Sequence, residues 1–367
     1  MSGKLLADYP IVQDYRKQFD AMKATRQDRI HHQEGDVYTH TQLVLNALLN
    51  LPEYRELSAF EKQVLEYTAI FHDIAKPVTY TVLDDNRITH PRHASVGASM
   101  ARQMLDKENY KFNFISAVYY TVFYHGYPFW LLEKENPLKS VITTSLLTSN
   151  KLLYIFAKAD LLGRVCKDPD DMLYKLELFK EFCLENHIYD KPKQFHAAYD
   201  RFYYFNLNDS YPDTQLFHQY DYTIYMLSGL PASGKDSYIH QRWGEELPII
   251  SLDDIREELD IGPTENQGRV IQLAREKSKE YCRRKQSFIW NATNITKNMR
   301  AQLIQTWLPY HPKIDIIFLF KNINDVLRDN TGREKEYKIS NEKILAMHEK
   351  VQFPTVLECH TLEVVAN

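Results

Sequence analysis

YTIYMLSGLPASGKD, residues 222–236, decides the fold of the second half of the chain. An apolar run leads into a loop in which Gly229 and Gly234 enclose four residues, and Lys235 follows directly. Glycines let backbone N–H groups turn inward around phosphate groups, the following helix offers its positive N-terminus, and a lysine reaches the terminal phosphates. The stretch therefore predicts a strand, a phosphate-binding loop and a helix in succession.

Short apolar runs alternate with polar helical stretches after this point. The runs are LPIISLD at 247–253, QSFIWNAT at 286–293 and KIDIIFLF at 313–320. Such alternation is typical of a parallel sheet covered by helices. We therefore predict an α/β P-loop domain with a parallel sheet over residues 222–367, in which NTGREKEYKIS at 330–340 forms a loop or lid.

The phosphate-binding loop predicts binding of ATP, or another nucleoside triphosphate, together with Mg²⁺. One position departs from the usual pattern, because Asp236 follows the lysine where a Ser or Thr normally holds Mg²⁺. A carboxylate is also a hard oxygen ligand, so Asp236 and Ser237 are alternative Mg²⁺ ligands. The candidate nucleotide-binding residues are Gly229, Ser233, Gly234, Lys235, Asp236 and Ser237.

Candidate catalytic residues follow the next apolar run, in SLDDIR at 251–256. Transfer of a phosphoryl group to a hydroxyl needs a carboxylate to take the proton, and Asp253 is the candidate base, with Asp254 as the alternative. Both acids also fit the first turn of a helix, where they would be structural. Arg256 comes one turn after Asp253, where a guanidinium can hold a phosphate of the substrate.

Arg328 and Arg333 stand in LRDNTGREKEYK at 327–338, which leads into the expected lid, where cations close over phosphates and stabilise charge in the transition state. With these residues, the segment 222–367 resembles the polynucleotide 5′-hydroxyl kinase family of P-loop phosphotransferases. The resemblance rests on GLPASGKD, on DDIR after the second strand and on the arginine-bearing lid. It implies Lys235 on the ATP phosphates, Asp253 as general base, Arg256 on the acceptor's phosphate, and Arg328 or Arg333 on the donor.

The residues before about position 185 follow a helical period. Apolar residues recur at three- and four-residue steps in TQLVLNALLN (41–50), EKQVLEYTAIFHDIA (61–75), HASVGASMARQML (93–105) and NKLLYIFAKADLLGRV (150–165). Strand signals are nearly absent there. We predict an all-α domain at 1–185, followed by an aromatic-rich linker at 186–221.

Two aspartates in apolar helical segments predict a metal centre. FHDIAKP at 71–77 places His72 beside Asp73, and Asp160 stands in IFAKADLLGR. A buried carboxylate is costly unless a metal or a cation compensates it. Imidazole and carboxylate ligands suit manganese, iron, cobalt, nickel or zinc, and six protein ligands are too many for one ion that also binds substrate. We therefore predict two divalent metals, held by His40, His72, Asp73, His93, His125 and Asp160.

The expected division of these ligands has Asp73 bridging the two ions. One ion is completed by His40, His72 and Asp160, and the other by His93 and His125. Lys76, one turn after the adjacent His and Asp, reaches the same pocket and can hold phosphate. This set resembles the HD superfamily of metal-dependent phosphohydrolases, whose pattern is H…HD…D with additional histidines in the two-metal branch.

An HD phosphohydrolase followed by a polynucleotide-kinase-like domain resembles the bacterial HD-Pnk enzymes, which heal broken nucleic-acid ends. The resemblance implies that the first domain hydrolyses a 2′,3′-cyclic phosphate, or a 3′- or 2′-phosphate, at an RNA or DNA end. It implies that the second domain phosphorylates a 5′-hydroxyl with ATP, after which a ligase seals the break. Two alternatives stay open: a nucleoside or small-alcohol kinase fused to a nucleotidase, and a non-catalytic nucleotide sensor.

Composition and charge limit the remaining classes of protein and partner. The chain has 367 residues, with 45 Lys and Arg against 49 Asp and Glu and a net charge of −4, so we expect any nucleic acid to be held locally, near an end, and not wrapped by a basic surface. No apolar run approaches the about 18 residues of a membrane helix, and the first residues lack the apolar core of a secretion signal. We expect a cytoplasmic protein without a membrane partner.

The four cysteines have no CxxC spacing and are expected to be buried thiols. The oligomeric state and the choice between RNA and DNA stay open.

Overall fold

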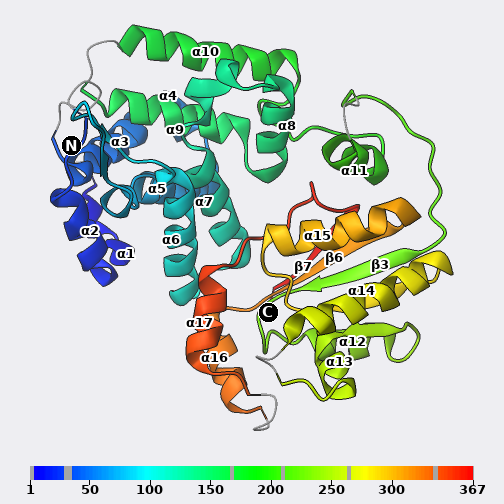
Figure 1. Cartoon of the computed structure of the whole chain (residues 1–367). Coiled ribbons are helices and arrows are strands. Elements are labelled where there is room, and N and C mark those ends of the chain that lie inside the picture. The colour runs from blue at the N-terminus through cyan, green and yellow to red at the C-terminus, as the bar shows by residue number, and fades with distance from the viewer. Residues whose placement is uncertain are drawn as a thin grey trace. The chain divides into compact units, whose positions relative to one another are not determined.

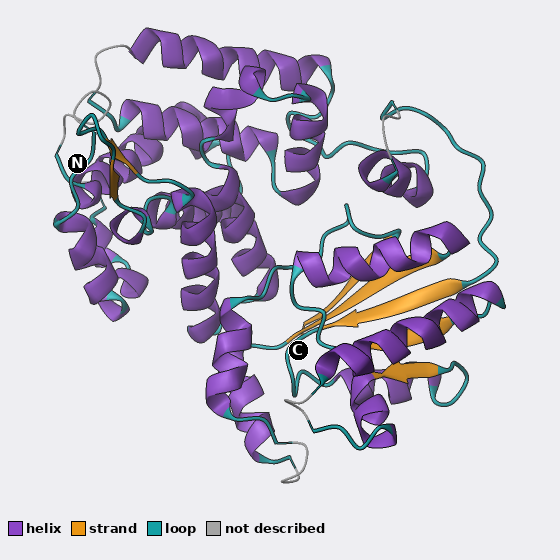
Figure 2. Cartoon of the chain, in the orientation of Figure 1, coloured by secondary structure: helices purple, strands orange, loops and turns teal. Residues whose placement is uncertain are grey.

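The structure is a computed structural model that describes residues 4–28, 35–165, 169–207, 211–262, 266–333 and 338–366. The chain folds into two compact units that divide between Lys193 and Gln194 (Figure 1). Helices make up nearly all of the first unit, and the second contains a parallel sheet (Figure 2). This confirms the predicted fold class. In the part of the chain that the structure describes, no helix has the length and apolar character that crossing a bilayer requires.

The first unit consists of helices joined by short connections. A two-residue strand pair, β1 (Thr81–Val82) with β2 (Ile88–Thr89), adds an antiparallel hairpin that the helical pattern did not predict. Short 3-10 helices are η1 (Leu6–Asp8), η2 (Lys76–Val78) and η3 (Tyr127–Glu133). The α-helices are α1 (Pro10–Asp14), α2 (Arg16–Lys23), α3 (Val37–Asn50), α4 (Pro52–Arg55), α5 (Ala59–Phe71), α6 (His93–Lys107), α7 (Phe112–Tyr124), α8 (Pro137–Leu147), α9 (Asn150–Leu162) and α10 (Pro169–Glu185).

Capping residues fix where two central helices of this unit begin. α3 starts after Asp36, whose side chain accepts a hydrogen bond from the backbone N–H of Thr39 at 2.8 Å. α5 starts after Ser58, which forms a reciprocal capping box with Glu61. Both arrangements satisfy backbone donors that a helix N-terminus otherwise leaves unpaired. The apolar faces of α3, α5, α7 and α9 then pack against one another and bring their chemically active residues to one place.

The second unit is built on a five-stranded parallel sheet with strand order β4-β5-β3-β6-β7. The strands are β3 (Thr223–Ser228), β4 (Ile249–Ser251), β5 (Phe288–Asn291), β6 (Lys313–Phe320) and β7 (Thr361–Ala366). The helices are α11 (Ala198–Asn206), α12 (Lys235–Trp243), α13 (Leu252–Glu258), α14 (Gln267–Arg283), α15 (Lys297–Trp307), η4 (Leu308–Tyr310), α16 (Ile323–Thr331) and α17 (Asn341–Glu349).

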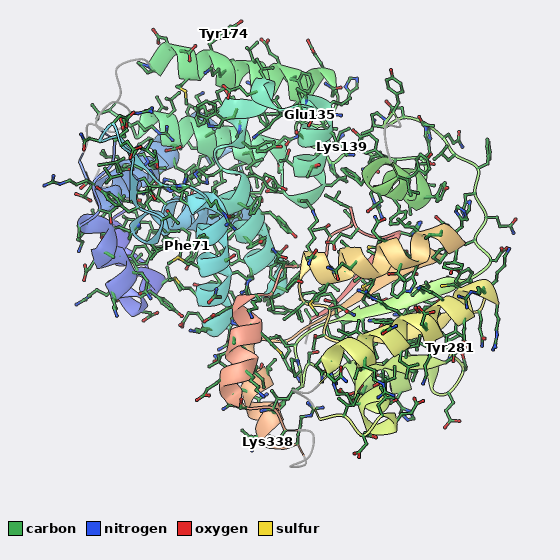
Figure 3. The ribbon with its side chains drawn as sticks, viewed as in Figure 1. Phe71, Glu135, Lys139, Tyr174, Tyr281 and Lys338 are labelled. Carbon is green, nitrogen blue, oxygen red and sulfur yellow. The ribbon has the colours of Figure 1, made fainter. Side chains whose placement is uncertain are left out.

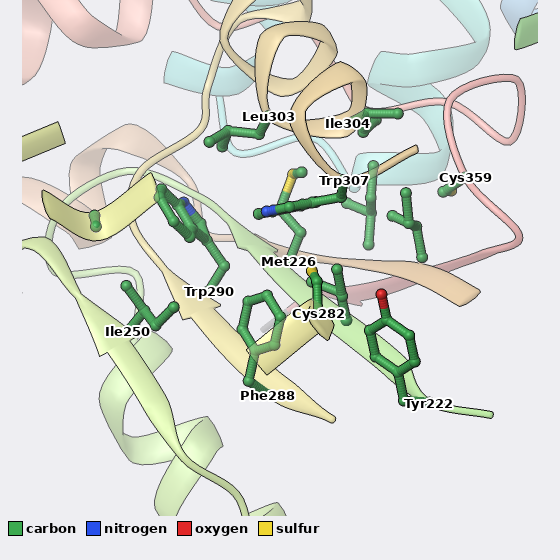
Figure 4. Packing of buried hydrophobic residues seen from close by; sticks show 14 of the residues in the cluster. Tyr222, Met226, Ile250, Cys282, Phe288, Trp290, Leu303, Ile304, Trp307 and Cys359 are labelled. Carbon is green, nitrogen blue, oxygen red and sulfur yellow. The ribbon is translucent and has the colours of Figure 1, made fainter. Parts of the chain in front are cut away.

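Apolar side chains cover both faces of this sheet. On one face, Met226 of β3 packs in a cluster that includes Trp290 of β5 and Trp307 of α15, whose rings are 5.5 Å apart (Figure 4). On the opposite face, Leu227 packs with Ile239 of α12. Successive residues of a strand point to opposite faces, so β3 is buried on both sides and holds the loop that follows it in a fixed position.

The predicted linker at 186–221 falls in both units, because the division lies between Lys193 and Gln194. Its second part contains α11, which docks on the second unit. Arg201 donates from Nε to the carbonyl of Val356 at 2.9 Å and from Nη2 to the carbonyl of His360 at 2.7 Å. Phe202 is buried in the sheet's main apolar cluster. The aromatic residues of α11 therefore extend the core of the second unit.

The cysteines agree with the expectation of buried thiols. Cys183, Cys282 and Cys359 are buried and unbridged. Cys166 lies outside the described residues.

Candidate active sites

The first unit brings five of the six predicted metal ligands together. His40 lies on α3, His72 and Asp73 follow Phe71 at the end of α5 (Phe71 is labelled in Figure 3), and His93 begins α6. His125 follows α7. Two groups have ligand atoms within 4.8 Å of one another, and both contain Asp73. The first group is His40, His72 and Asp73, and the second is Asp73, His93 and His125.

Three of these histidines have a ring orientation that suits metal binding. His72, His93 and His125 each place Nδ1 on the backbone carbonyl three residues earlier, at 2.9, 2.9 and 2.7 Å. A carbonyl only accepts, so Nδ1 carries a proton in each ring and Nε2 is left as the atom that can bind a metal. Nε2 of His72 is buried 3.2 Å from Asp73 Oδ2 and makes no hydrogen bond. Burial also lowers the pKa of His125 to about 3, which keeps that ring neutral.

Asp160 approaches His40 but belongs to neither group of three. Its Oδ1 lies 3.1 Å from Nε2 of His40. Arg164, one turn later on α9, donates to the same carboxylate from Nε at 3.2 Å and also from Nη2. Burial raises the pKa of Asp160, but the charge of Arg164 and the hydrogen bond from His40 hold it well below the usual range. Its role as a ligand stays a prediction, and Arg164 is a partner that the sequence reasoning missed.

Lys76 contacts the shared carboxylate directly. Its Nζ lies 2.7 Å from Asp73 Oδ2 and donates to Oε1 of Gln27 at 2.6 Å. Burial raises the pKa of Asp73, but the charges of His72 and Lys76 outweigh it and hold that pKa well below the usual range. The lysine therefore lies against the shared carboxylate, and its role in holding phosphate stays a prediction. The buried Gln27 that accepts its hydrogen bond was not foreseen.

Gly163 lets α9 approach α3 closely enough for the contact between Asp160 and His40. A Cβ at this position would lie 2.7 Å from the backbone of Val44 on α3. We therefore expect Gly163→Ala to push the helices apart, with a loss of about 1–3 kcal/mol in the free energy of unfolding. Denaturant unfolding measures this loss. Gly97→Ala is the matched control, because its Cβ would meet neighbours no closer than 3.5 Å. Equal stability of the two variants would contradict the packing argument.

The second unit places the glycine-rich loop between β3 and α12. Gly229 has φ +155°, and a Cβ there would lie 2.7 Å from the carbonyl oxygen of Leu319 and 2.8 Å from Oγ of Ser233. Gly234 has φ +93° and stands at the N-terminus of α12. Only glycine fits both positions without strain. The loop therefore turns its backbone at the helix N-terminus, as a phosphate-binding loop does.

Lys235 folds back onto this loop. Its Nζ donates to the carbonyls of Gly229 at 3.2 Å and Leu230 at 2.8 Å. Burial, with a smaller contribution from the charge of Arg333, lowers the pKa of Lys235 to about 8 against the opposing charge of Asp236. The ammonium group therefore lies over the loop, where two backbone carbonyls accept its hydrogen bonds.

The two predicted lid arginines differ in their surroundings. Arg333 is close enough for its charge to act on Lys235. Arg328 is 69% exposed and pairs with Asp325 of its own helix at 2.5 Å. Asn330, fully buried, donates to the carbonyl of Ile339 at 2.6 Å and so ties the two sides of the predicted lid together. Residues 334–337 of that lid lie outside the described residues.

Residues at the carboxyl end of the strands complete the second site. Asp253 is exposed and forms an ion pair with Arg256, which also donates from Nε to Gln267 at 2.9 Å. Asp236 accepts a hydrogen bond at Oδ1 from Nδ2 of Asn291 at 2.7 Å. Gln267 and Asn291 were not identified from the sequence. Asn291 could have been identified from the sequence, because it is a polar residue at the end of an apolar strand run.

Two parts of the chain match known protein families. Residues 37–146 match the family described as HD domain, and residues 224–354 match the family described as AAA domain. The chain therefore joins an HD domain to a P-loop kinase-like domain. This supports a fusion of a phosphohydrolase with a kinase, in which the first domain implies divalent metals and the second a nucleotide with Mg²⁺.

Three solved structures are each similar to about two fifths of the chain. A candidate kinase from Chloroflexus aurantiacus is 17% identical, with 41% of this chain and 87% of that chain covered and a TM-score of 0.34. Kti12 of Chaetomium thermophilum, in complex with ADP-AlF3, is 14% identical over 39% and 88% of the two chains, with a TM-score of 0.30. A sugar kinase from a Janibacter species is 15% identical over 40% and 86%, with a TM-score of 0.28. No curated protein matches the chain.

Proposed function

We propose that this protein heals nucleic-acid ends with two separate activities. The P-loop domain phosphorylates the 5′-hydroxyl of an RNA or DNA end with ATP and Mg²⁺. The HD domain, loaded with two divalent metals, hydrolyses a 2′,3′-cyclic phosphate or a terminal 3′- or 2′-phosphate. The two products are the ends that a ligase joins. The proposal extends the resemblance to HD-Pnk enzymes that the two sets of motifs indicate.

The arrangement in the P-loop domain supports phosphoryl transfer. Lys235 moves from its loop carbonyls to the nucleotide phosphates, and Arg333 brings a second positive charge to them. Asp253 takes the proton of the acceptor hydroxyl, because it is an exposed carboxylate directly after β4. Alignment and neutralisation of charge supply most of the rate enhancement in such reactions.

The arrangement in the HD domain supports hydrolysis of a phosphoester. Divalent ions held by these residues would supply a nucleophile and would neutralise the charge of phosphate oxygens. Asp73 lies with Oδ2 3.2 Å from Nε2 of His72 and with Oδ1 3.6 Å from Nε2 of His93, which fits a ligand shared by the two groups. Lys76 holds a phosphate oxygen of the substrate at the same place, because its Nζ lies beside that carboxylate. The contacts of Nδ1 with backbone carbonyls in His72 and His125 leave Nε2 of each ring as the atom that can bind an ion.

The observation that carries the choice of a polynucleotide is the position of Arg256. Its guanidinium contacts Asp253 and is held by Gln267, so a cation stands beside the candidate base. A nucleotide within a strand has a 3′-phosphate near its 5′-hydroxyl, and a guanidinium binds such a group with two hydrogen bonds. A free nucleoside or a sugar offers no phosphate at this place.

Acceptor preference tests this assignment. We expect kcat/KM for phosphorylation to rise from a nucleoside to a nucleoside 3′-monophosphate and an oligonucleotide. Arg256→Gln is expected to lower kcat/KM for the two phosphate-bearing acceptors by about 10–100-fold and to leave the nucleoside unaffected, because hydrogen bonds to a charged group contribute about 1.5–3 kcal/mol. Arg284→Gln, an exposed arginine at the far end of α14, controls for the loss of charge. Equal use of all acceptors by the unaltered protein would favour a metabolite kinase instead.

A further inference from the structure

Two positions near the P-loop carry residues of unexpected chemical type. P-loop enzymes that use Mg²⁺ hold the ion with a Ser or Thr after the P-loop lysine and with an Asp carried by a second strand. In this chain the residue after Lys235 is Asp236, and the strand next to β3 ends in Asn291. The carboxylate of Asp236 therefore follows the P-loop lysine, and the neutral amide of Asn291 stands at the end of the strand.

The two side chains contact each other directly. β5 runs parallel to β3 with Met226 paired to Trp290, so the end of β5 lies beside the start of the loop. Nδ2 of Asn291 donates to Oδ1 of Asp236 at 2.7 Å, although the residues are 55 positions apart in the chain. A carboxylate on the strand as well would place two like charges at hydrogen-bond distance, which is unfavourable. An Asp on the loop therefore fits an Asn on the strand.

We propose that the carboxylate ligand for Mg²⁺ has moved from the strand to the P-loop, so that Asp236 binds the ion and Asn291 holds Asp236 in position. The inference rests on the nucleotide-binding half of the proposed function. Carboxylate oxygen is a preferred ligand of Mg²⁺, and the ion is usually bound through one or two carboxylates together with substrate phosphates. Asp236 lies in the first turn of α12, at the end of the helix where the phosphates are expected.

The competing explanation is that Asp236 only stabilises the start of α12. An acid in the first turn interacts favourably with the helix dipole, and Ser237 would then be the Mg²⁺ ligand. The two explanations differ in what they predict for metal dependence. A stabilising acid affects the free energy of unfolding without Mg²⁺, whereas a ligand affects how much Mg²⁺ strengthens nucleotide binding.

An isosteric exchange of the pair tests the proposal. Affinity for a non-hydrolysable ATP analogue is measured by calorimetry with excess Mg²⁺ and again with EDTA, and the ratio gives the coupling between the two ligands. Asp236→Asn keeps the acceptor for Asn291 but removes the charge, and we expect this ratio to fall about tenfold. The double variant D236N/N291D returns a carboxylate to the strand and preserves a hydrogen bond between the side chains. We expect it to recover the ratio to within about threefold of the original.

A control variant and two further comparisons show whether Asp236 or Ser237 binds Mg²⁺. Glu245→Gln, an exposed acid beyond the far end of α12, controls for the loss of one negative charge. An unchanged ratio in Asp236→Asn, together with a reduced ratio in Ser237→Ala, would overturn the proposal in favour of Ser237. A double variant no better than Asp236→Asn would show that the strand position cannot supply the ligand. No acceptor is present in these titrations, so failure to phosphorylate 5′-hydroxyl ends would refute the proposed function without affecting this result.

Discussion

Lys235→Ala is expected to abolish phosphorylation of a 5′-hydroxyl oligonucleotide and to leave phosphoester hydrolysis unchanged. Within the described residues, Nζ donates hydrogen bonds to the carbonyls of Gly229 and Leu230, and no carboxylate holds it in an ion pair, so the ammonium can exchange these partners for phosphates. Loss of one positioned charge in a phosphoryl-transfer site lowers kcat by about a hundredfold or more. Transfer of labelled γ-phosphate measures the effect.

The control for this variant is its own stability and its second activity. An unchanged thermal transition and unchanged hydrolysis of a 3′-phosphate would show that the rest of the protein is intact. Phosphorylation at the original rate would contradict the assignment of the P-loop as the donor site.

Asp73→Asn should have the opposite effect, with loss of hydrolysis and retention of the kinase. The carboxylate is shared by both histidine groups and is compensated by Lys76, so an amide in its place leaves the cations without a counter-charge. Because bound ions contribute several kcal/mol of charge stabilisation, hydrolysis should fall by about two orders of magnitude or more. Metal content per chain, measured by mass spectrometry of the purified protein, should fall with it.

A second variant guards against loss of folding. His93 is only half-buried and belongs to one of the two groups, so His93→Ala should remove one ion per chain and keep the helical circular dichroism signal. Metal content equal to that of the unaltered protein in both variants would contradict a two-metal centre. Loss of both activities in a folded Asp73→Asn protein would contradict separate sites.

The P-loop domain could be predicted from the sequence in most of its features because its signals are local. The strand, the two glycines and Lys235 are neighbours in the chain, and the apolar runs of β4, β5 and β6 are short and distinct. The hairpin of β1 and β2 gave no such signal, since each strand has two residues. The docking of α11 was also not predicted, because it depends on Arg201 meeting carbonyls about 155 positions away.

Part of the candidate metal site could be predicted from residue type and local sequence context. The adjacent His72 and Asp73 in an apolar helix indicated a buried, compensated carboxylate, and the structure places both in one cluster with three further predicted histidines. The partners that orient these groups could not be read from the sequence. Gln27 meets Lys76 across 49 positions, and only the packing of separate segments brings such residues together. The contact of Arg164 with Asp160 could have been predicted from the sequence, because residues four positions apart lie on the same face of a helix.

Both activities proposed for end healing can be followed on a single oligonucleotide. The purified protein is given ATP, Mg²⁺, Mn²⁺ and an oligonucleotide with a 5′-hydroxyl and a 3′-phosphate, and both termini are followed together. We expect gain of the 5′-phosphate and loss of the 3′-phosphate, with Lys235→Ala blocking only the first change and Asp73→Asn only the second. Two unchanged termini, in a preparation that turns over nucleosides or mononucleotides, would contradict end healing.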